Sequence, residues 1–203
     1  MVNISTIQGL SELVLAIGMS WLIQQVPEAY PYAFHLQAAF SCFILAGIFG
    51  APRYGLKQLV SIHWMTRMIA TVMPLCILAT CVSVLPLPGH RTVIDTLVQT
   101  HEALLFSIAL ACSVAAGITG QEPIAKRAQL PFVLYIVSAT LRELLATGTH
   151  GAGVPIASAL LLFVARDHML RAICPPIIAE PGRRILLVFA MYFMVAGLTG
   201  VAA

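Results

Sequence analysis

Long runs of apolar residues, separated by short polar connections, restrict this chain to the few folds that a lipid bilayer permits. A helix needs about 20 predominantly apolar residues to cross the hydrocarbon core. The runs lack the strict alternation of a membrane β-barrel, so they predict an all-α integral membrane protein. Seven predicted spans fit near residues 4–25, 31–50, 65–86, 93–119, 129–148, 151–166 and 184–203.

Proline or glycine combined with polar residues marks the connections, because these residues end helices and begin turns. The sixth run is the shortest of the seven. The segment 168–180, which contains Pro175 and Pro176, could lie along the membrane interface instead of extending a helix. A bundle of about seven helices is therefore the prediction, and a bundle of six is the alternative.

Composition excludes a water-soluble domain of ordinary kind. Apolar residues make up 60% of the chain and charged residues 9%, whereas charged residues make up about 25% of a soluble domain. We find no internal repeat, no low-complexity tract and no soluble module, so residues 1–203 are predicted to form a single transmembrane helical domain. Glycine-rich phosphate loops are absent, and neither nucleotide nor nucleic acid is an expected ligand. The opening segment lacks a basic stretch, so we expect its apolar run to be retained rather than cleaved.

Lysine and arginine fall almost wholly in alternate connections, which predicts the orientation in the membrane. Nine of the eleven lie on one side, and the opposite side holds Arg91, while Arg142 lies within the fifth span. The amino terminus is therefore predicted to be cytoplasmic and the carboxyl terminus to lie outside. The nine are Arg53, Lys57, Arg67, Lys126, Arg127, Arg166, Arg171, Arg183 and Arg184.

Ionisable groups inside hydrocarbon cost at least about 2.5 kcal/mol each, so every one is a functional hypothesis. Most of the polar residues within the predicted spans fall in the outer half of the bilayer, and His150 follows in an outer connection. They could fasten the helices together or form a site. The predicted intramembrane polar residues are Glu12, His35, Gln37, Gln99, His101, Glu102, Arg142 and Glu143.

Two cofactor sites are possible within this outer cluster. Imidazole and carboxylate ligands suit zinc, and His35, His101, Glu102 and His150 could together hold it for a metal-dependent lipid hydrolase. Haem b needs one histidine from each of two helices at similar depth, and His35 and His101 meet that condition. Haem would make the chain a redox protein.

No motif is specific for an activity, so the leading functional prediction is an accessory or structural subunit of a larger membrane assembly. Such a subunit would pack against other membrane protein subunits and bind lipid or cofactor. A proton- or cation-coupled transporter using Glu12, Glu102 and Glu143 is a further alternative, with Pro74 as a hinge. Catalysis is the less expected outcome. A bacterial inner membrane fits this alanine- and leucine-rich chain, and an organellar membrane is the alternative.

Overall fold

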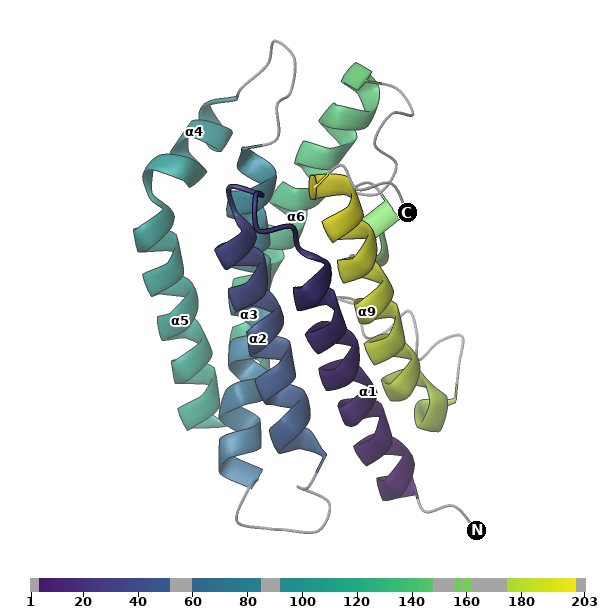
Figure 1. Cartoon of the computed structure of the whole chain (residues 1–203). Coiled ribbons are helices and arrows are strands. Elements are labelled where there is room, and N and C mark those ends of the chain that lie inside the picture. The colour runs from purple at the N-terminus through teal and green to yellow at the C-terminus, as the bar shows by residue number, and fades with distance from the viewer. Residues whose placement is uncertain are drawn as a thin grey trace.

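A bundle of long helices forms the protein, as seen in a computed structural model (Figure 1). The structure describes residues 4–51, 60–84, 92–147, 156–157, 159–161 and 175–199. All regular secondary structure in these residues is helical, as predicted. We refer to the end at which α1 and α9 begin as the lower end, and to the opposite end as the upper end, as drawn in Figure 1.

The first three helices are α1 (Ile4–Gln25), α2 (Ala33–Gly50) and α3 (Val60–Ser83). They run alternately up and down through the bundle (Figure 1). The first two match the predicted spans closely, because proline and polar residues bound them sharply. Helix α3 begins one turn earlier than predicted, since its polar first turns were assigned to the connection. Pro74 lies inside α3, which continues through it.

The predicted fourth span, 93–119, is divided in two by the structure. Helix α4 (Val93–Thr100) ends at His101, whose φ of −110° and ψ of 24° are not helical, and α5 (Glu102–Thr119) then begins in a new direction. An unbroken helix over 93–119 is therefore wrong. Gly120 ends α5 with a φ of +67°, a conformation that glycine adopts without strain. That sharp turn leads directly into α6.

The last two long helices are α6 (Glu122–Thr147) and α9 (Pro176–Thr199). Helix α6 begins seven residues and α9 eight residues before the predicted spans, which start at 129 and 184, because their first turns carry charged side chains. Helices α6 and α9 run in the same direction, from the lower to the upper end (Figure 1). The predicted sixth span falls between them and lies mostly outside the described residues.

Five of these helices are long and apolar enough to cross a membrane. Helix α6 is long enough, but its charged and amide side chains lower its hydropathy, and α4 is too short. The protein is therefore an all-helical membrane protein with five candidate spans in the described residues. The five segments are Ile7–Gln25, Ala33–Gly50, Ser61–Ser83, Glu102–Thr119 and Ile178–Thr199.

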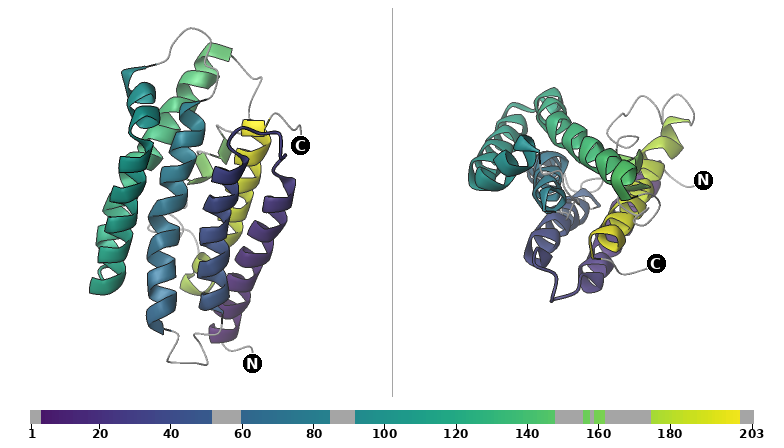
Figure 2. Two further views of the ribbon diagram at one scale, coloured as in Figure 1. Left: turned by 60° about the vertical axis from the view of Figure 1, so that its left-hand side comes forward. Right: turned by 90° about the horizontal axis from the view of Figure 1, so that it is seen from above.

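Helix α3 lies at the centre and packs against α2, α5 and α6, while α9 packs against α1 (Figure 2). The main apolar core lies between α1, α2, α3, α6 and α9 and includes Met19, Phe40, Leu78, Ile136 and Met191. Glycines bring helices close together in this core. A Cβ atom on Gly47 would lie 2.6 Å from the carbonyl oxygen of Glu12, and one on Gly18 would lie 2.9 Å from Val188.

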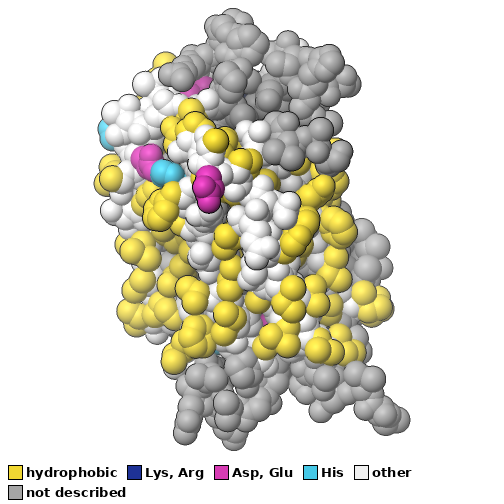
Figure 3. All heavy atoms as spheres, in the orientation of Figure 1, with side chains coloured by type: hydrophobic (Ala, Val, Ile, Leu, Met, Phe, Trp, Pro, Cys, Tyr) yellow, Lys and Arg dark blue, Asp and Glu magenta, His cyan; other side chains and the backbone are white. Residues whose placement is uncertain are grey.

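Apolar side chains cover most of the face seen in Figure 3, over the length of the bundle. Acidic and histidine side chains on this face gather toward its upper end. Large exposed apolar residues such as Ile17, Leu104 and Leu134 occur on several helices. Such a surface suits lipid, and it also suits other membrane helices, so it does not by itself indicate a partner.

Candidate functional site: a charged cavity at the lower end

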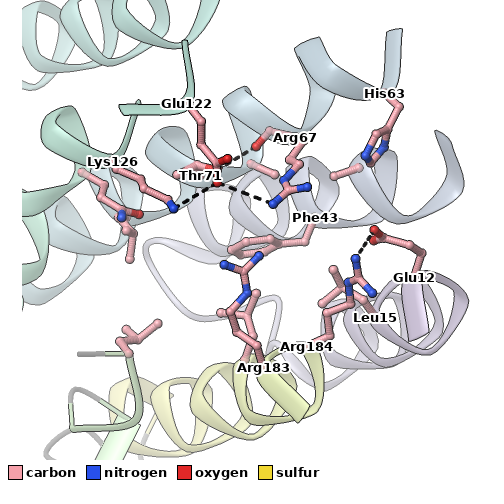
Figure 4. A pocket seen from close by; sticks show the side chains of 16 residues that line it. Glu12, Leu15, Phe43, His63, Arg67, Thr71, Glu122, Lys126, Arg183 and Arg184 are labelled. Atoms are coloured by element: carbon pink, nitrogen blue, oxygen red, sulfur yellow. Dashed lines mark hydrogen bonds and ion pairs between the residues drawn. The ribbon is translucent and has the colours of Figure 1, made fainter. Parts of the chain in front are cut away.

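The lower end of the bundle contains a cavity of about 120 Å³ that is lined by residues of α1, α2, α3, α6 and α9 and by Leu161. Charged side chains from α1, α3, α6 and α9 surround it (Figure 4). Because about 10 to 15 Å³ of such space suffices for one water molecule, the cavity can hold several waters or a small polar group. The polar lining residues are Glu12, His63, Arg67, Thr71, Glu122, Lys126, Gln129, Arg183 and Arg184.

Glu122 joins two cations from different helices across one side of the cavity. Its carboxylate lies 3.2 Å from the Lys126 ammonium on the same helix and 3.5 Å from the Arg67 guanidinium on α3. Glu122 occupies the first turn of α6, where the helix dipole favours a negative charge. One carboxylate therefore forms ion pairs with two cations.

On the opposite side, Glu12 of α1 forms an ion pair with Arg184 of α9, and both side chains are buried. The Arg184 guanidinium also donates to the hydroxyl of Ser11 and to the carbonyl oxygen of Gln8, which lies 3.3 Å away. A Cβ atom on Gly50 would lie 2.7 Å from the Glu12 carboxyl carbon, so the bare glycine makes room for it. This pair joins α1 to α9 at the depth of the cavity, and α2 packs closely beside Glu12.

Arg183 extends from α9 toward the space between these two groups (Figure 4). Its guanidinium lies 3.5 Å from the carboxylate of Glu180, one turn earlier on the same helix. Among the described lining residues, four cationic side chains stand against two carboxylates. The cavity therefore brings four cationic side chains together close to one end of the bundle.

The upper end contains two of the predicted site residues in direct contact. The Nε2 atom of His35 on α2 lies 2.7 Å from a carboxylate oxygen of Glu102 in the first turn of α5. The rings of Tyr32 and Phe106 pack beside the imidazole, at centroid distances of 5.3 and 6.3 Å. This contact joins α2 to α5, and both side chains are about 30% exposed.

Arg142 pairs with a residue that the sequence analysis did not single out, Asp95 of α4. The guanidinium donates to both carboxylate oxygens of Asp95, at 3.0 and 3.1 Å. Tyr135 donates to the same carboxylate at 2.6 Å, and the backbone N–H of Thr92 does so at 2.8 Å. Burial alone raises the pKa of Asp95, but these donors outweigh it and hold the pKa well below its usual range.

A capping box explains why Asp95 points to this network. Thr92 accepts from the backbone N–H of Asp95, and Asp95 accepts from the backbone N–H of Thr92, which fixes the start of α4. The pattern Thr92-Val93-Ile94-Asp95 is visible in the sequence, and it could have identified the partner of Arg142. Sequence reasoning left Asp95 out of the intramembrane polar residues, although it lies within the predicted span 93–119.

The remaining predicted residues that the structure describes are not brought into one site. His101 is exposed, with its Nδ1 atom 3.2 Å from the carbonyl oxygen of Leu97, and Gln99 donates to the carbonyl oxygen of Ser83 at 2.7 Å. Gln37 is half-buried on α2. His150 and the side chain of Glu143 lie outside the described residues.

The described geometry does not provide a complete ligand set for zinc or for haem. Among the described residues, no group of three or more His, Cys, Asp or Glu side chains is placed to hold a metal ion. The zinc prediction includes His150 and so stays a prediction. For haem, the Nε2 atom of His35 is engaged with Glu102, and His101 faces outward.

Comparisons with known proteins give no further guide to this site. No protein-family model matches the chain, and no curated protein and no solved structure is significantly similar to it.

Proposed function

We propose that this chain is a membrane protein that binds an anionic group, a phosphate or a carboxylate, in the cavity at its lower end. The observation that carries the proposal is the convergence of cationic side chains from three helices, Arg67, Lys126 and Arg183, on one cavity. Guanidinium and ammonium groups that face one space can donate to a shared anionic ligand.

The cationic side chains divide into two roles. Arg184 is buried against Glu12 and positions the helices. Arg67, Lys126 and Arg183 are less buried and would meet the ligand directly. The guanidinium groups provide planar pairs of donors that match phosphate and carboxylate oxygens, and the ammonium adds a point charge. Glu122 would compete with the ligand for Arg67 and Lys126.

The test compares two neighbouring cations on α6. Lys126 lines the cavity, whereas Arg127 is exposed and does not. We expect the full chain, in an uncharged detergent at low salt, to bind inorganic phosphate or acetate in a calorimetric titration. Lys126→Ala should weaken that binding roughly tenfold, the effect of losing one charged hydrogen bond, and Arg127→Ala should change it little.

Two results would overturn the proposal. One is a wild-type chain that binds neither anion. The other is equal weakening by the two alanine variants, because equal effects would come from overall charge and not from the cavity.

We also propose the full topology suggested by the sequence, with about seven spans, a cytoplasmic amino terminus and an external carboxyl terminus. The lower end would then be cytoplasmic, and its described bases Arg67, Lys126, Arg127, Arg183 and Arg184 support that orientation. A further crossing between α6 and α9 would explain why both run upward. Reporter fusions after residue 199 should be active only on the external side, and cytoplasmic activity would contradict this topology.

For the membrane and the assembly in which the protein works, our proposal follows the sequence prediction. We propose that it works as an accessory subunit in a membrane assembly, in a bacterial inner membrane, where its bound anionic ligand would form part of the complex. Extraction in a mild detergent tests this: an apparent mass well above that of one chain supports it, and a lone monomer contradicts it. The haem, zinc and transport alternatives have no comparable support among the described contacts.

A further inference from the structure

Two of the helices that line the lower cavity carry a proline well inside their length, Pro74 in α3 and Pro131 in α6. A proline has no N–H, so it leaves the carbonyl oxygen four residues earlier without its helical donor, and it is a common cause of bends in long helices. The carbonyl groups concerned belong to Ala70 and Arg127. Each helix is therefore weakened at one point.

The apolar packing of α6 and α3 changes at the same two points. Above Pro131, α6 contributes Val133, Ile136 and Ala139 to the main core. Below it, α6 contributes to a second, smaller core that it shares with α3 and α5. On α3, the main core takes most buried residues above Pro74, and Ala70 is a contact below it. The buried members of the smaller core are Met68, Val72, Cys76, Ala109, Ala116 and Ala125.

The ion pairs of the cavity follow the same division (Figure 4). Glu122 of α6 pairs with Arg67 of α3 on one wall, and Glu12 of α1 pairs with Arg184 of α9 on the other. Helix α1 contains no proline. Pro181 of α9 lies in the second turn, below Arg184, so the rest of that helix is uninterrupted. The wall formed by α1 and α9 thus lacks a weak point at the depth of the cavity.

Helix α5 belongs to the wall formed by α3 and α6. A Cβ atom on Gly117 would lie 2.5 Å from the sulfur of Met65, so α5 and α3 approach closely at the lower end. A sharp turn joins the lower end of α5 to α6. At the upper end, the non-helical residue His101 separates α5 from α4, and the contact of Glu102 with His35 lies beside it. Helix α5 can therefore tilt about its upper end without bending.

We propose that α5 and the parts of α3 and α6 below Pro74 and Pro131 form one hinged unit, which turns about the two prolines against the rest of the bundle. A closely packed core resists deformation and moves as a body, while a hinge confines the change in backbone angles to a few residues. Because the hinged unit forms one wall of the cavity, its movement would widen or narrow the cavity. This inference goes beyond the proposed function, since the movement needs no ligand.

The experiment measures distances between pairs of spin labels in the full chain, reconstituted in lipid vesicles. Labels carried by non-canonical amino acids leave the five native cysteines in place. Leu10 on α1 and Ile62 on α3 are both exposed and lie in opposite walls. Ile62 lies about 18 Å below Pro74, so a bend of about 20° would move it by about 6 Å. The distance distribution should be broader by about that amount than the one between Leu10 and the exposed Ile185, which share a wall.

Replacing a proline separates the hinge from loose helix ends. Pro131 is exposed, so Pro131→Ala removes no packing and restores an N–H for the carbonyl group of Arg127. We expect the distribution between Leu10 and Ile62 to narrow toward that of the pair within one wall. The matched control is Pro123→Ala in the first turn of α6, where no helical N–H donor is required, and it should leave the width unchanged.

Three results would overturn the proposal. The first is equal widths for the two label pairs in the unaltered chain. The second is a width that Pro131→Ala leaves unchanged, and the third is equal narrowing by Pro123→Ala. If a variant does not fold, the comparison of the two label pairs in the unaltered chain still decides the matter.

Discussion

The two ends of this bundle differ in how their charged side chains are arranged. At the upper end, each described carboxylate that lies between helices contacts one basic side chain, Glu102 with His35 and Asp95 with Arg142. At the lower end, four cationic side chains and two carboxylates line an open space, and Glu122 contacts two of the cations. The upper end is thus a set of closed contacts, while the lower end has room for a ligand beside its cations.

The difference shows that an intramembrane ionisable residue is weak evidence of a site when its partner lies within reach. The sequence drew attention to the upper end because more such residues fall there. A site needs space as well as charge, and among the described residues those two conditions meet at the lower end.

The largest expected effect comes from breaking the buried pair at the lower end. Arg184→Met would leave the Glu12 carboxylate buried without its cation, so we expect a loss of about 3 to 5 kcal/mol in the free energy of unfolding. Denaturation in detergent measures it, with the exposed Arg127→Met as the matched control. Adding Glu12→Gln should recover part of the loss. A loss no larger than that of the control would contradict the role of this pair.

Close packing beside that pair gives the next effect. Gly47→Ala would place a methyl group against the backbone of Glu12, and we expect a loss of about 1 to 3 kcal/mol. Gly182 on α9 has no atom within 4 Å of an added Cβ, so Gly182→Ala should be neutral or slightly stabilising. Thermal unfolding of both variants checks this, and equal midpoints would show that α1 and α2 do not approach as closely as described.

At the upper end, Asp95→Asn should act locally. The change removes the carboxylate that accepts from Arg142, Tyr135 and Thr92, so we expect α4 to loosen at a cost of about 1 to 3 kcal/mol. Hydrogen exchange should accelerate over Val93–Thr100 and remain unchanged at the lower end. Uniform acceleration across all helices would instead mean that Asp95 stabilises the whole bundle.

The smallest expected effect is the pH dependence of the contacts that Asp95 makes at the upper end. The lowered pKa of Asp95 means that its stabilising contribution is fully present above the unfolded value, about 3.9, and is lost only as pH falls through the folded value. Exchange protection of α4 should therefore be the same at pH 7 and pH 5. Loss of protection at pH 5 in the wild type would show that Asp95 is not held ionised.

Sequence alone was informative about what lies in the membrane. Apolar run length predicted α1 and α2 within two residues, because Pro27 and Gly50-Ala51-Pro52 bound them without ambiguity. It was less informative where charged residues continue a helix, as at Arg67, Lys126 and Arg183. There the charges were assigned to connections, although the first turns of a spanning helix can hold them at the membrane surface.

The site could not be predicted for a related reason. Periodicity and charge counts place a residue at a depth but do not show which helices face each other. Glu12 and Arg184 lie eight residues into α1 and α9, which are parallel and adjacent, so they meet. That meeting depends on α9 beginning at Pro176, before the predicted start at residue 184.

The central claim, that the cations of the lower cavity form an anion site, predicts effects of opposite sign at two residues in contact. Glu122→Gln removes the competing carboxylate and should tighten inorganic phosphate binding roughly tenfold, whereas Lys126→Gln should weaken it by a similar factor. Calorimetric titration of the two variants beside the wild type is the most direct measurement. Opposite shifts are the predicted result. Weakening by both variants, or no change in either, would contradict the claim.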